Sequence, residues 1–372
     1  MQPTPQSGYD RIAALVAAAF IGLVATACWI NFVHPRPVDF LSYWAVAQMA
    51  LEGRGEAIYD IAAHRSVEMS AVPIQGLLPF PYPPPFLLIV APFGLLPYGV
   101  AFAAWVLVAG LLYVVAASRH FRPAFALAHP GVVSNGLVGQ NGFLTSAIIL
   151  LGTRWLEVRP LLAGAILGLM VIKPQLAVLL PVALVAGRHW HALAGAATSS
   201  LLLLAAALLA FGIGAYEGFL RILPVYAEFM SAGGWPWNEM ASPFAFARYL
   251  GASAAVALAI HSVIAATAAM IVWRAWRRGW EGRVPILAAA TILIPPYLFS
   301  YDALLLVLPL ASLMVDRRRS WLVPIVWGLS ALPLASNFGL YAGPNTITIA
   351  AIILLISMSV DAVRPSRKGS LK

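Results

Sequence analysis

Long runs of apolar residues, separated by short polar stretches, follow one another along the whole chain. A helix needs about 20 apolar residues to cross a bilayer, and fewer where it tilts or ends in a cavity. The pattern therefore predicts an all-α integral membrane protein, a helical bundle with about twelve spans that forms a single membrane domain over residues 1–372. The predicted spans are residues 12–31, 84–97, 99–117, 137–153, 160–173, 175–187, 191–213, 250–273, 284–300, 302–315, 321–338 and 343–361. Pro97 and Pro174 each separate two neighbouring runs, so each pair could instead be one kinked helix.

Two longer stretches interrupt these runs, at residues 32–83 and 214–249. In the first, DFLSYWAVAQMALEGRG repeats apolar residues at helical spacing and ends at Gly53, which predicts an amphipathic helix in the membrane interface. A second short helix is expected near residues 60–70, ahead of a proline run at residues 79–85 that interrupts helix and redirects the chain. The second stretch suits either a lid over a cavity or an interfacial anchor.

Composition supports a membrane environment and excludes several other classes. Hydrophobic residues make up 61% of the chain and charged residues 10%, whereas a soluble domain has about 45–50% and about 25%. The net charge of +9 comes from basic residues in short loops between apolar runs, which is typical of membrane topology and not of a nucleic-acid groove. A lone cysteine, Cys28, excludes an internal disulfide and a CxxC metal site.

The distribution of Lys and Arg predicts the orientation. With a cytoplasmic N-terminus and twelve spans, 15 of the 23 basic residues face the cytoplasm and 8 face the other side. Because cytoplasmic loops are enriched in Lys and Arg, we expect both termini to be cytoplasmic. Residues 32–83 and 214–249 then form two extracytoplasmic loops.

Asp39, between the first span and the predicted interfacial helix, is the first candidate for chemistry. Asp is among the preferred residues at a helix N-cap, so one reading is a structural cap. A carboxylate at the membrane surface is also partly desolvated, which makes it a stronger base and suits it to general-base catalysis. The two readings are compatible.

Lys173 stands between two apolar runs in LMVIKPQLAVLL and is the second candidate. A lysine within the hydrocarbon region is costly and usually faces a cavity, although a long side chain can also snorkel to the interface. Pro174 breaks the helix beside it and frees backbone groups to line a polar pocket. We therefore expect Lys173 to bind an anion such as a phosphate, with Gln175 adding hydrogen bonds.

Further polar residues lie on the same predicted side. Gln140 and Asn141 follow Gly139 at the start of the fourth span. Their amides can bind hydroxyls, and a helix N-terminus favours an anion. The alternative is an ordinary N-terminal turn without a binding role. Tyr301 and Asp302 lie in SYDALLLVLPL. A charged Asp302 within the membrane is costly and would indicate a functional site, or the pair is a cap on the tenth span. Arg119 and Arg122, in the third predicted outer stretch, could add positive charge.

The chain shows no nucleotide-phosphate loop, GxSxG, HExxH or dinucleotide fingerprint. An enzyme of this composition is therefore expected to receive its activated substrate through the membrane, which favours a lipid-linked donor over a nucleotide sugar.

Four stretches carry a resemblance to a known family: DFLSYWAVAQMALEGRGEAIYD, FPYPPPFLLIVAPFGLLP, GQNGFLTSAIILL and LLAGAILGLMVIKPQLAVLLPVAL. Their order and spacing resemble glycosyltransferase family 87 over roughly residues 39–190, and SYDALLLVLPL resembles its C-terminal half more loosely. Some relatives carry a histidine where this chain has SYD, so the resemblance assigns no definite role to Tyr301 and Asp302.

The resemblance implies a GT-C membrane fold in the plasma (inner) membrane. It implies transfer of a sugar, most often mannose, with inversion, from a polyprenyl-phosphate donor to a lipid or glycan acceptor of the cell envelope, at an extracytoplasmic site. It also implies that Asp39 is the catalytic base and that Lys173 lies near the donor phosphate. Because the lysine can neutralise that phosphate, we predict neither a metal nor another cofactor, and no nucleic-acid partner.

Two other functions remain open from the residues. A transporter or flippase of a lipid-linked sugar would use Lys173 and Asp302 as a binding site near the bilayer midplane. An envelope-assembly scaffold would need no catalysis, and its function would survive Asp39→Asn. The outer loop with Asp39 and the lack of obvious inverted repeats favour the enzyme.

Overall fold

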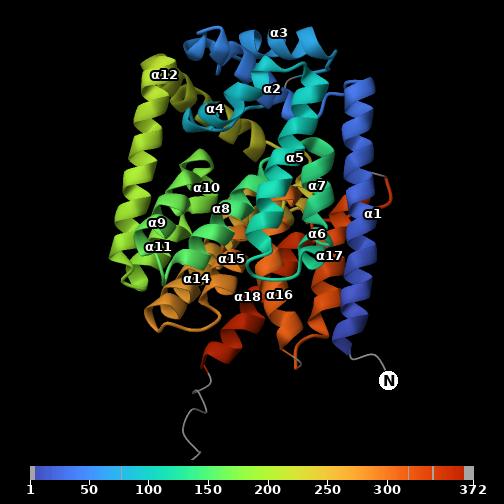
Figure 1. The fold of residues 1–372 in the computed structure, drawn as a ribbon, viewed down its shortest axis with the longest axis vertical. Helices are drawn as coiled ribbons and strands as arrows, with labels where there is room; N and C mark the ends of the chain where they lie inside the picture. The colour runs from blue at the N-terminus through green and yellow to red at the C-terminus, as the bar shows by residue number, and fades with distance from the viewer. Residues whose placement is uncertain (1–4, 77, 317, 337–338, 364–372) are drawn as a thin grey trace, which may run out of the picture. The chain divides into compact units, whose positions relative to one another are not determined.

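The computed structural model describes residues 5–76, 78–316, 318–336 and 339–363, and their regular secondary structure is helical (Figure 1). This agrees with the predicted all-α membrane class. The chain divides into two compact units: unit 1, formed by Met1–Pro174 and His191–Pro236, and unit 2, formed by Gln175–Trp190 and Trp237–Lys372. Whether both belong to a single domain stays a prediction.

Unit 1 holds the N-terminal helices and most of a long helix, α12. Its elements are α1 (Pro5–Val33), α2 (Phe40–Leu51), η1 (Gly55–Ala57), α3 (Ile61–Ala71), α4 (Pro85–Val90), η2 (Ala91–Leu95), α5 (Tyr98–Ala117), α6 (Pro123–Leu127), α7 (Gly131–Val138), α8 (Gly142–Trp155), α9 (Pro160–Gly168), η3 (Leu169–Ile172) and α12 (Trp190–Ser231). The short α10 (Pro174–Ala177) lies at the border with unit 2.

Unit 2 is built around α14. Ser253 caps the first turn of this helix, because its hydroxyl oxygen accepts a hydrogen bond from the Val256 amide. Arg274 and Arg277 lie in its last turn, where positive charge is favourable. The elements of unit 2 are α11 (Leu179–Ala186), η4 (Trp237–Glu239), α13 (Pro243–Tyr249), α14 (Ala254–Arg277), α15 (Arg283–Ile292), η5 (Ser300–Leu306), α16 (Val307–Val315), α17 (Leu322–Ser336) and α18 (Ile347–Val363).

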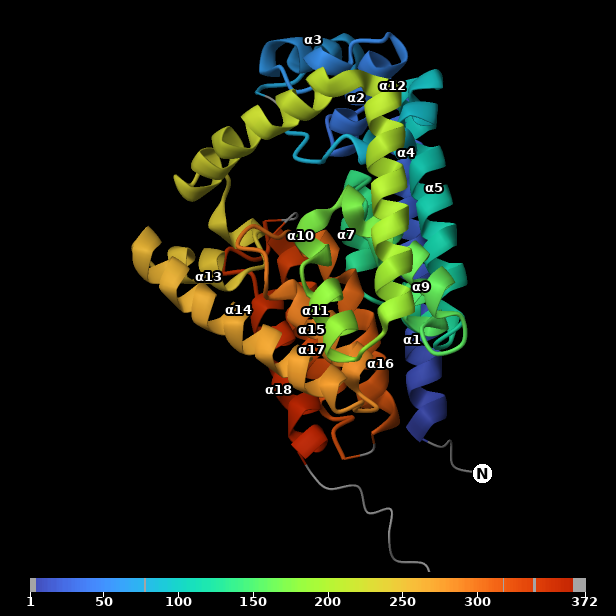
Figure 2. The same ribbon diagram turned by 90° about the vertical axis from the view of Figure 1, so that its left-hand side faces the viewer.

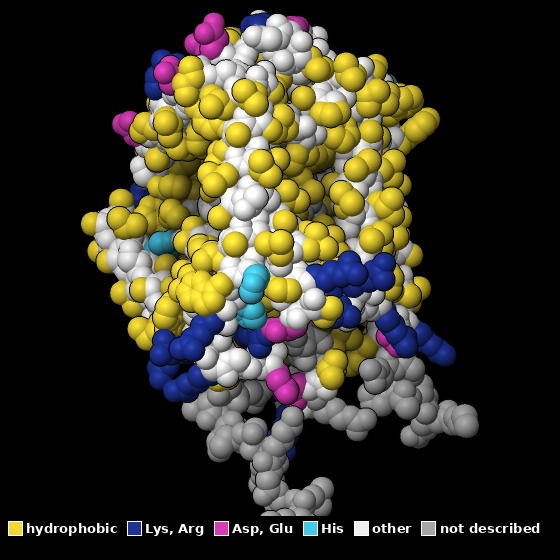
Figure 3. Space-filling model, turned by 60° about the vertical axis from the view of Figure 1, so that its left-hand side comes forward, with side chains coloured by type: hydrophobic (Ala, Val, Ile, Leu, Met, Phe, Trp, Pro, Cys, Tyr) yellow, Lys and Arg dark blue, Asp and Glu magenta, His cyan; other side chains and the backbone are white. Residues whose placement is uncertain are grey.

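Four helical stretches in the described part of the chain are long and apolar enough to cross a membrane: Tyr9–Val33, Tyr98–Ala117, Trp190–Ser231 and Ala254–Arg277. They contain the predicted spans 12–31, 99–117 and 191–213 and most of the predicted span 250–273. The other predicted spans are shorter or broken helices, so a count of twelve is not confirmed. The face in Figure 3 is covered largely by hydrophobic side chains, as expected for a surface in contact with lipid.

The predicted span at residues 84–97 does not form a crossing helix. It folds into α4 and η2, which together have 11 residues and pack against α2. The indole of Trp44 in α2 donates to the Leu96 carbonyl at 2.9 Å, and the ring of Phe86 in α4 lies 5.0 Å from that of Tyr43 in α2. Because both parts of this segment contact α2, α5 begins on the same side as α2.

Unit 1 therefore has two ends. At the Asp39 end, α1 ends and α5 begins, and the Tyr98 hydroxyl donates to the Arg36 carbonyl at 2.7 Å. At the Arg122 end, α1 begins and α5 ends, and Arg122 pairs with Asp10. Figures 1 and 2 show α2, α3 and α4 gathered at the Asp39 end. Which end faces the cytoplasm stays a prediction.

The helix predicted from DFLSYWAVAQMAL is present as α2, and it ends before Gly53, whose φ of +72° suits glycine. It does not lie amphipathically on a surface, however: eight of its twelve residues are buried. Apart from Ser42 and Gln48 its residues are apolar or aromatic, and a helix of that kind is stable when neighbours surround it. Here η2, α3, α4 and α5 do so. The second predicted helix is α3, with Asp60 as its N-cap.

α12 bends sharply at Gly212, whose φ of 76° and ψ of 171° are accessible almost only to glycine. The part before the bend has no charged residue and is about 33 Å long at 1.5 Å per residue. The part after the bend runs in a different direction and contains Glu217, Arg221 and Glu228 (Figure 2). Gly212 thus separates a segment that is long and apolar enough to cross a membrane from a mixed polar and apolar one.

Candidate functional site

Asp39 directly precedes α2, but its side chain does not cap that helix. One of its carboxylate oxygens, Oδ2, accepts a hydrogen bond from Nε2 of Gln140 at 2.8 Å. The N-cap position anticipated from the sequence is therefore occupied, while the carboxylate takes part in a contact between segments 101 residues apart. This half-buried carboxylate is the starting point of a polar network in unit 1.

A break between α7 and α8 lets Gln140 reach Asp39 and Asn141 reach Lys173. Gly139 ends α7 in the left-handed conformation, with a φ of 70°. A Cβ at this position would lie 2.6 Å from Cβ of Phe40, so glycine allows the break to approach the start of α2. Asn141 then stands at the N-cap of α8, as the predicted helix start requires.

Two tyrosines fix the orientation of the Gln140 amide. The hydroxyls of Tyr43 and Tyr82 both bond to Oε1 of Gln140, Tyr82 at 3.0 Å, and they lie 2.9 Å from each other. The amide therefore presents its oxygen to the hydroxyls and its NH₂ group to the Asp39 carboxylate, since a reversed amide would place two oxygens together. All three side chains are nearly inaccessible to solvent.

Sequence reasoning missed both tyrosines. Tyr43 lies four residues after Asp39 and hence on the same face of a helix, which is a signal that could have identified it. Tyr82 lies inside the proline run, whose path the sequence does not define.

Lys173 lies at the end of the network opposite Asp39. The chain leaves helical geometry here, between η3 and Pro174, and the lysine is only 2% exposed. Its Nζ donates to Oδ1 of Asn141 at 2.9 Å and lies 5.7 Å from the centre of the Tyr82 ring, a cation–π contact. The side chain is thus buried within unit 1 and does not snorkel to an interface.

The network joins a carboxylate to an ammonium group through two consecutive amides and two hydroxyls. Among the described residues, the buried Nδ2 of Asn141 has no hydrogen-bond partner, and buried polar groups usually have one. A nearby carboxylate can accept a proton, while a buried ammonium and a spare amide donor can stabilise an anion. The arrangement therefore suits a displacement in which negative charge develops on a leaving group.

Three of the other predicted site residues belong to unit 2. Gln175 is half-buried at its start, and Tyr301 stacks on Phe299 with ring centres 5.6 Å apart. Asp302 is buried in the first turn of η5, at 3% exposure. Their participation in a site with Asp39 stays a prediction.

Arg119 and Arg122 are not brought to this network. The Arg122 side chain is 75% exposed and pairs with Asp10 near the start of α1. Asp39 follows the other end of that helix, about 35 Å away at 1.5 Å per residue from Asp10 to Val33. Arg119 follows the end of α5 that is remote from Tyr98. This placement differs from the predicted one because residues 84–97 fold into α4 and η2 and do not cross the membrane, which reverses the direction of α5.

Within the described residues, no group of three or more His, Cys, Asp and Glu side chains is arranged to hold a metal ion. The predicted independence of metals and other cofactors stays a prediction.

The fold and the network define a helical membrane protein in which a buried ammonium is joined to a carboxylate through amides and hydroxyls. The chain belongs to glycosyltransferase family 87, whose family model matches residues 80–300 and thus more than half of its length. This confirms the family suggested by the sequence. The matched region includes Gln140, Asn141 and Lys173, whereas Asp39 and Tyr43 precede it. Neither the curated proteins nor the solved structures contain a match to the chain.

Proposed function

We propose that this glycosyltransferase transfers a sugar from a polyprenyl-phosphate donor to a hydroxyl of an envelope lipid or glycan. The observation that carries the proposal is the network in which the amides of Gln140 and Asn141 join the Asp39 carboxylate to the Lys173 ammonium. A donor anchored in lipid suits a site in a membrane protein of this composition. We take mannose as the first sugar to test, because it is the sugar most often implied by the family resemblance.

Asp39 is the general base in this reaction. Its carboxylate takes the proton of the acceptor hydroxyl while the acceptor oxygen attacks the anomeric carbon. The bond between that carbon and the phosphate oxygen breaks, and polyprenyl phosphate leaves with the bonding electrons. A single displacement inverts the anomeric centre, whereas retention would need a second carboxylate as a nucleophile.

Lys173 and Asn141 stabilise the departing phosphate. The leaving group is already activated, so the main requirement is compensation of the negative charge that develops on it. A buried ammonium does this well, because the surrounding medium screens its charge less than water does. The amide Nδ2 of Asn141 adds a donor beside it.

The site is proposed to face the outer side of the plasma membrane, following the charge bias of the loops. Membership of a glycosyltransferase family favours this enzyme over the transporter that the sequence left open.

The proposal is tested with purified protein in nanodiscs, polyprenyl-phosphate-mannose and a set of lipid and glycan acceptors. Asp39→Asn keeps the size of the side chain and removes the base, and we expect it to lower the transfer rate by about 10²–10⁴-fold. Glu52→Gln, at the C-terminal end of the same helix and remote from the network, serves as the control. Equal rates for wild type and Asp39→Asn would remove Asp39 from its role, and no transfer by a folded wild type with any acceptor would overturn the proposed donor.

A further inference from the structure

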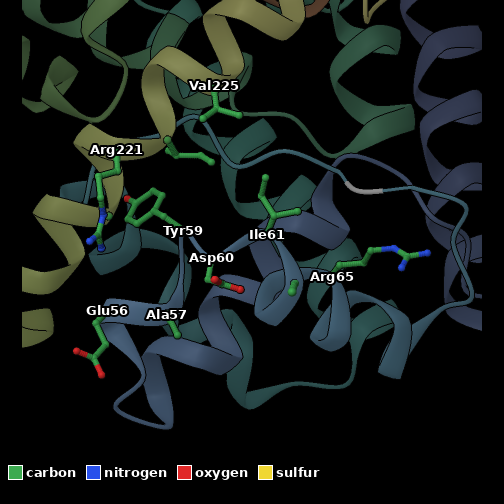
Figure 4. Close-up of a pocket in the computed structure, with 11 residues that line it drawn as sticks. Glu56, Ala57, Tyr59, Asp60, Ile61, Arg65, Arg221 and Val225 are labelled. Atoms are coloured by element: carbon green, nitrogen blue, oxygen red, sulfur yellow. The ribbon is translucent and has the colours of Figure 1, made fainter.

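Unit 1 contains a cavity of about 990 Å³ at the Asp39 end, outside the network described above (Figure 4). Its walls come from residues 56–65, which include η1 and the start of α3, and from the part of α12 after Gly212. In Figure 4, Arg221 and Glu56 lie on one side, Arg65 lies on the opposite side, and Tyr59 and Asp60 lie between them. The volume is in the upper part of the range of about 300–1,000 Å³ that is common for small-molecule sites.

The two walls are held together by glycines at three close approaches. A Cβ on Gly214 would lie 2.8 Å from Cβ of Glu56, and one on Gly218 would lie 3.2 Å from the Tyr59 ring. A Cβ on Gly55 would lie 2.4 Å from the Phe211 carbonyl oxygen, just before the bend of α12. The walls can approach this closely because these positions lack side chains, so the cavity is a defined part of unit 1.

Two acidic and two basic side chains line the cavity, and their capacity for hydrogen bonds is only partly used within the protein. Glu56 and Arg221 are exposed lining residues, so their charged groups are accessible to a ligand. Asp60 uses Oδ1 to cap α3, and Arg65 uses Nε to bond the Gly76 carbonyl at 2.7 Å, which leaves further oxygens and nitrogens of both side chains. Carboxylates that accept and guanidinium groups that donate suit a neutral ligand with many hydroxyls.

Tyr59 connects the cavity wall with the network around Asp39. Its hydroxyl donates to the Tyr82 carbonyl at 2.7 Å, and the Tyr82 hydroxyl bonds to Gln140, which in turn donates to Asp39. Tyr59 is itself only 6% exposed, so it separates the cavity from the network. A ligand in the cavity therefore lies near the network without occupying it.

We propose that this cavity binds the part of a saccharide acceptor that lies one or more sugar residues away from the hydroxyl that attacks the donor. The inference rests on the proposed function. The donor phosphate is an unsuitable occupant because two of the lining residues, Glu56 and Asp60, are acidic, and a hydrocarbon chain is unsuitable because four of the lining residues are charged. Binding energy from such a remote part of the substrate orients the reacting hydroxyl at Asp39.

The experiment measures binding of n-octyl mannoside and n-octyl mannotrioside to the full-length protein in nanodiscs by calorimetry, without a donor. We expect the trioside to bind about tenfold more tightly than the monoside in the wild type. Arg221→Ala and Glu56→Gln each remove a charged partner of a hydroxyl and should abolish most of that difference, while the affinity for the monoside stays unchanged.

Ala62→Trp, at an exposed position of the cavity wall, should block the trioside alone. Arg54→Ala, on the same segment but paired with Glu52 outside the cavity, is the control.

Equal affinities of the wild type for the two glycosides would overturn the inference. So would a preference for the trioside that persists in both Arg221→Ala and Ala62→Trp, or competition by phosphatidylethanolamine head groups in place of saccharides. Because binding is measured without a donor and is expected to persist in Asp39→Asn, this result can be interpreted even if the proposed transfer reaction fails.

Discussion

The two ends of unit 1 hold charged residues in opposite circumstances. At the Asp39 end, Lys173 is 2% exposed and its ammonium group bonds a buried amide. At the Arg122 end, the Arg122 side chain is 75% exposed and forms an ion pair with Asp10 on the surface. Both basic residues lie beside an apolar run in the sequence, Arg122 together with Arg119.

Under the proposed function, burial distinguishes a residue of the site from one that only marks the orientation in the membrane. A buried ammonium is expensive and is retained where its charge has a use. An exposed arginine near a helix end costs little and contributes to orientation across the membrane. The following predictions test this contrast, from the largest expected effect to the smallest.

Lys173→Met removes the buried charge and keeps a side chain of similar length. We expect transfer from the polyprenyl-phosphate donor to fall by about 10²–10³-fold, as on loss of a donor that stabilises developing negative charge. Single-turnover rates measure the effect, and the thermal unfolding midpoint shows whether the variant folds. A transfer rate close to that of the wild type would mean that burial at this end does not mark the phosphate site.

Tyr43→Phe and Tyr82→Phe test the orientation of the Gln140 amide. Each single variant leaves one hydroxyl on Oε1, so we expect a loss of about 1 kcal/mol in the free energy of unfolding. The double variant leaves the buried oxygen unsatisfied and frees the amide to turn, so the losses should exceed the sum of the singles by about 0.5–3 kcal/mol.

The double-mutant cycle is measured by denaturant unfolding together with the transfer rate. Additive losses would show that the two hydroxyls do not act on the same amide.

His64 and Glu68 of α3 form another buried pair at the Asp39 end, with Nε2 and Oε1 3.5 Å apart. Burial lowers the pKa of His64 from 6.5 to about 4 and raises the pKa of Glu68 from 4.5 to about 7. Between pH 4.5 and pH 6.5, the unfolded chain carries one proton on His64, and the folded chain carries one proton on Glu68. Because both states bind the same number of protons, the pair contributes little to the pH dependence of stability in this range.

Replacing either residue alone should reveal the pH dependence of stability that the other residue contributes. In Glu68→Gln, the unfolded chain protonates His64 below its ordinary pKa of 6.5 and the folded chain does not, so stability relative to wild type falls as pH decreases from 6.5 toward about 4. In His64→Gln, the folded chain keeps the Glu68 proton and the unfolded chain does not, so relative stability falls as pH rises from 4.5 through about 7. Unfolding curves at several pH values check the two opposite slopes, and parallel curves would contradict the pairing.

Arg122→Ala should change least. An exposed ion pair contributes about 0–1 kcal/mol, so we expect unfolding and the transfer rate to stay near wild type. A loss of transfer comparable to that of Lys173→Met would contradict the separation of the two ends. Asp10→Asn, which breaks the same pair from the other side, should behave identically.

Several parts of the fold and the site follow from local sequence. The long apolar runs at α1, α5, α12 and α14 are unambiguous because they reach or exceed the length needed to cross a bilayer. α3 begins at Asp60 as a capped helix should, and Gly139 marks a break that only a residue without Cβ allows.

Other parts could not be derived in this way. An apolar run as short as residues 84–97 is compatible with a tilted span and with a buried helix, because periodicity does not distinguish them. Packing of α4 and η2 on α2 decides for the second. That choice reverses the direction of α5 and moves Arg119 and Arg122 away from Asp39.

The sequence by itself determined that this is a helical membrane protein and that Asp39 and Lys173 are unusual in their apolar surroundings. Both conclusions depend on the cost of burying charge and backbone in lipid, which composition and spacing reveal. Only the tertiary structure decided that Tyr43 and Tyr82 orient Gln140, that Asn141 reaches Lys173, and that α12 forms a cavity with residues 56–65. Hydrogen bonds between distant segments depend on atomic positions to within a few tenths of an ångström, and these positions result from the packing of all the helices together.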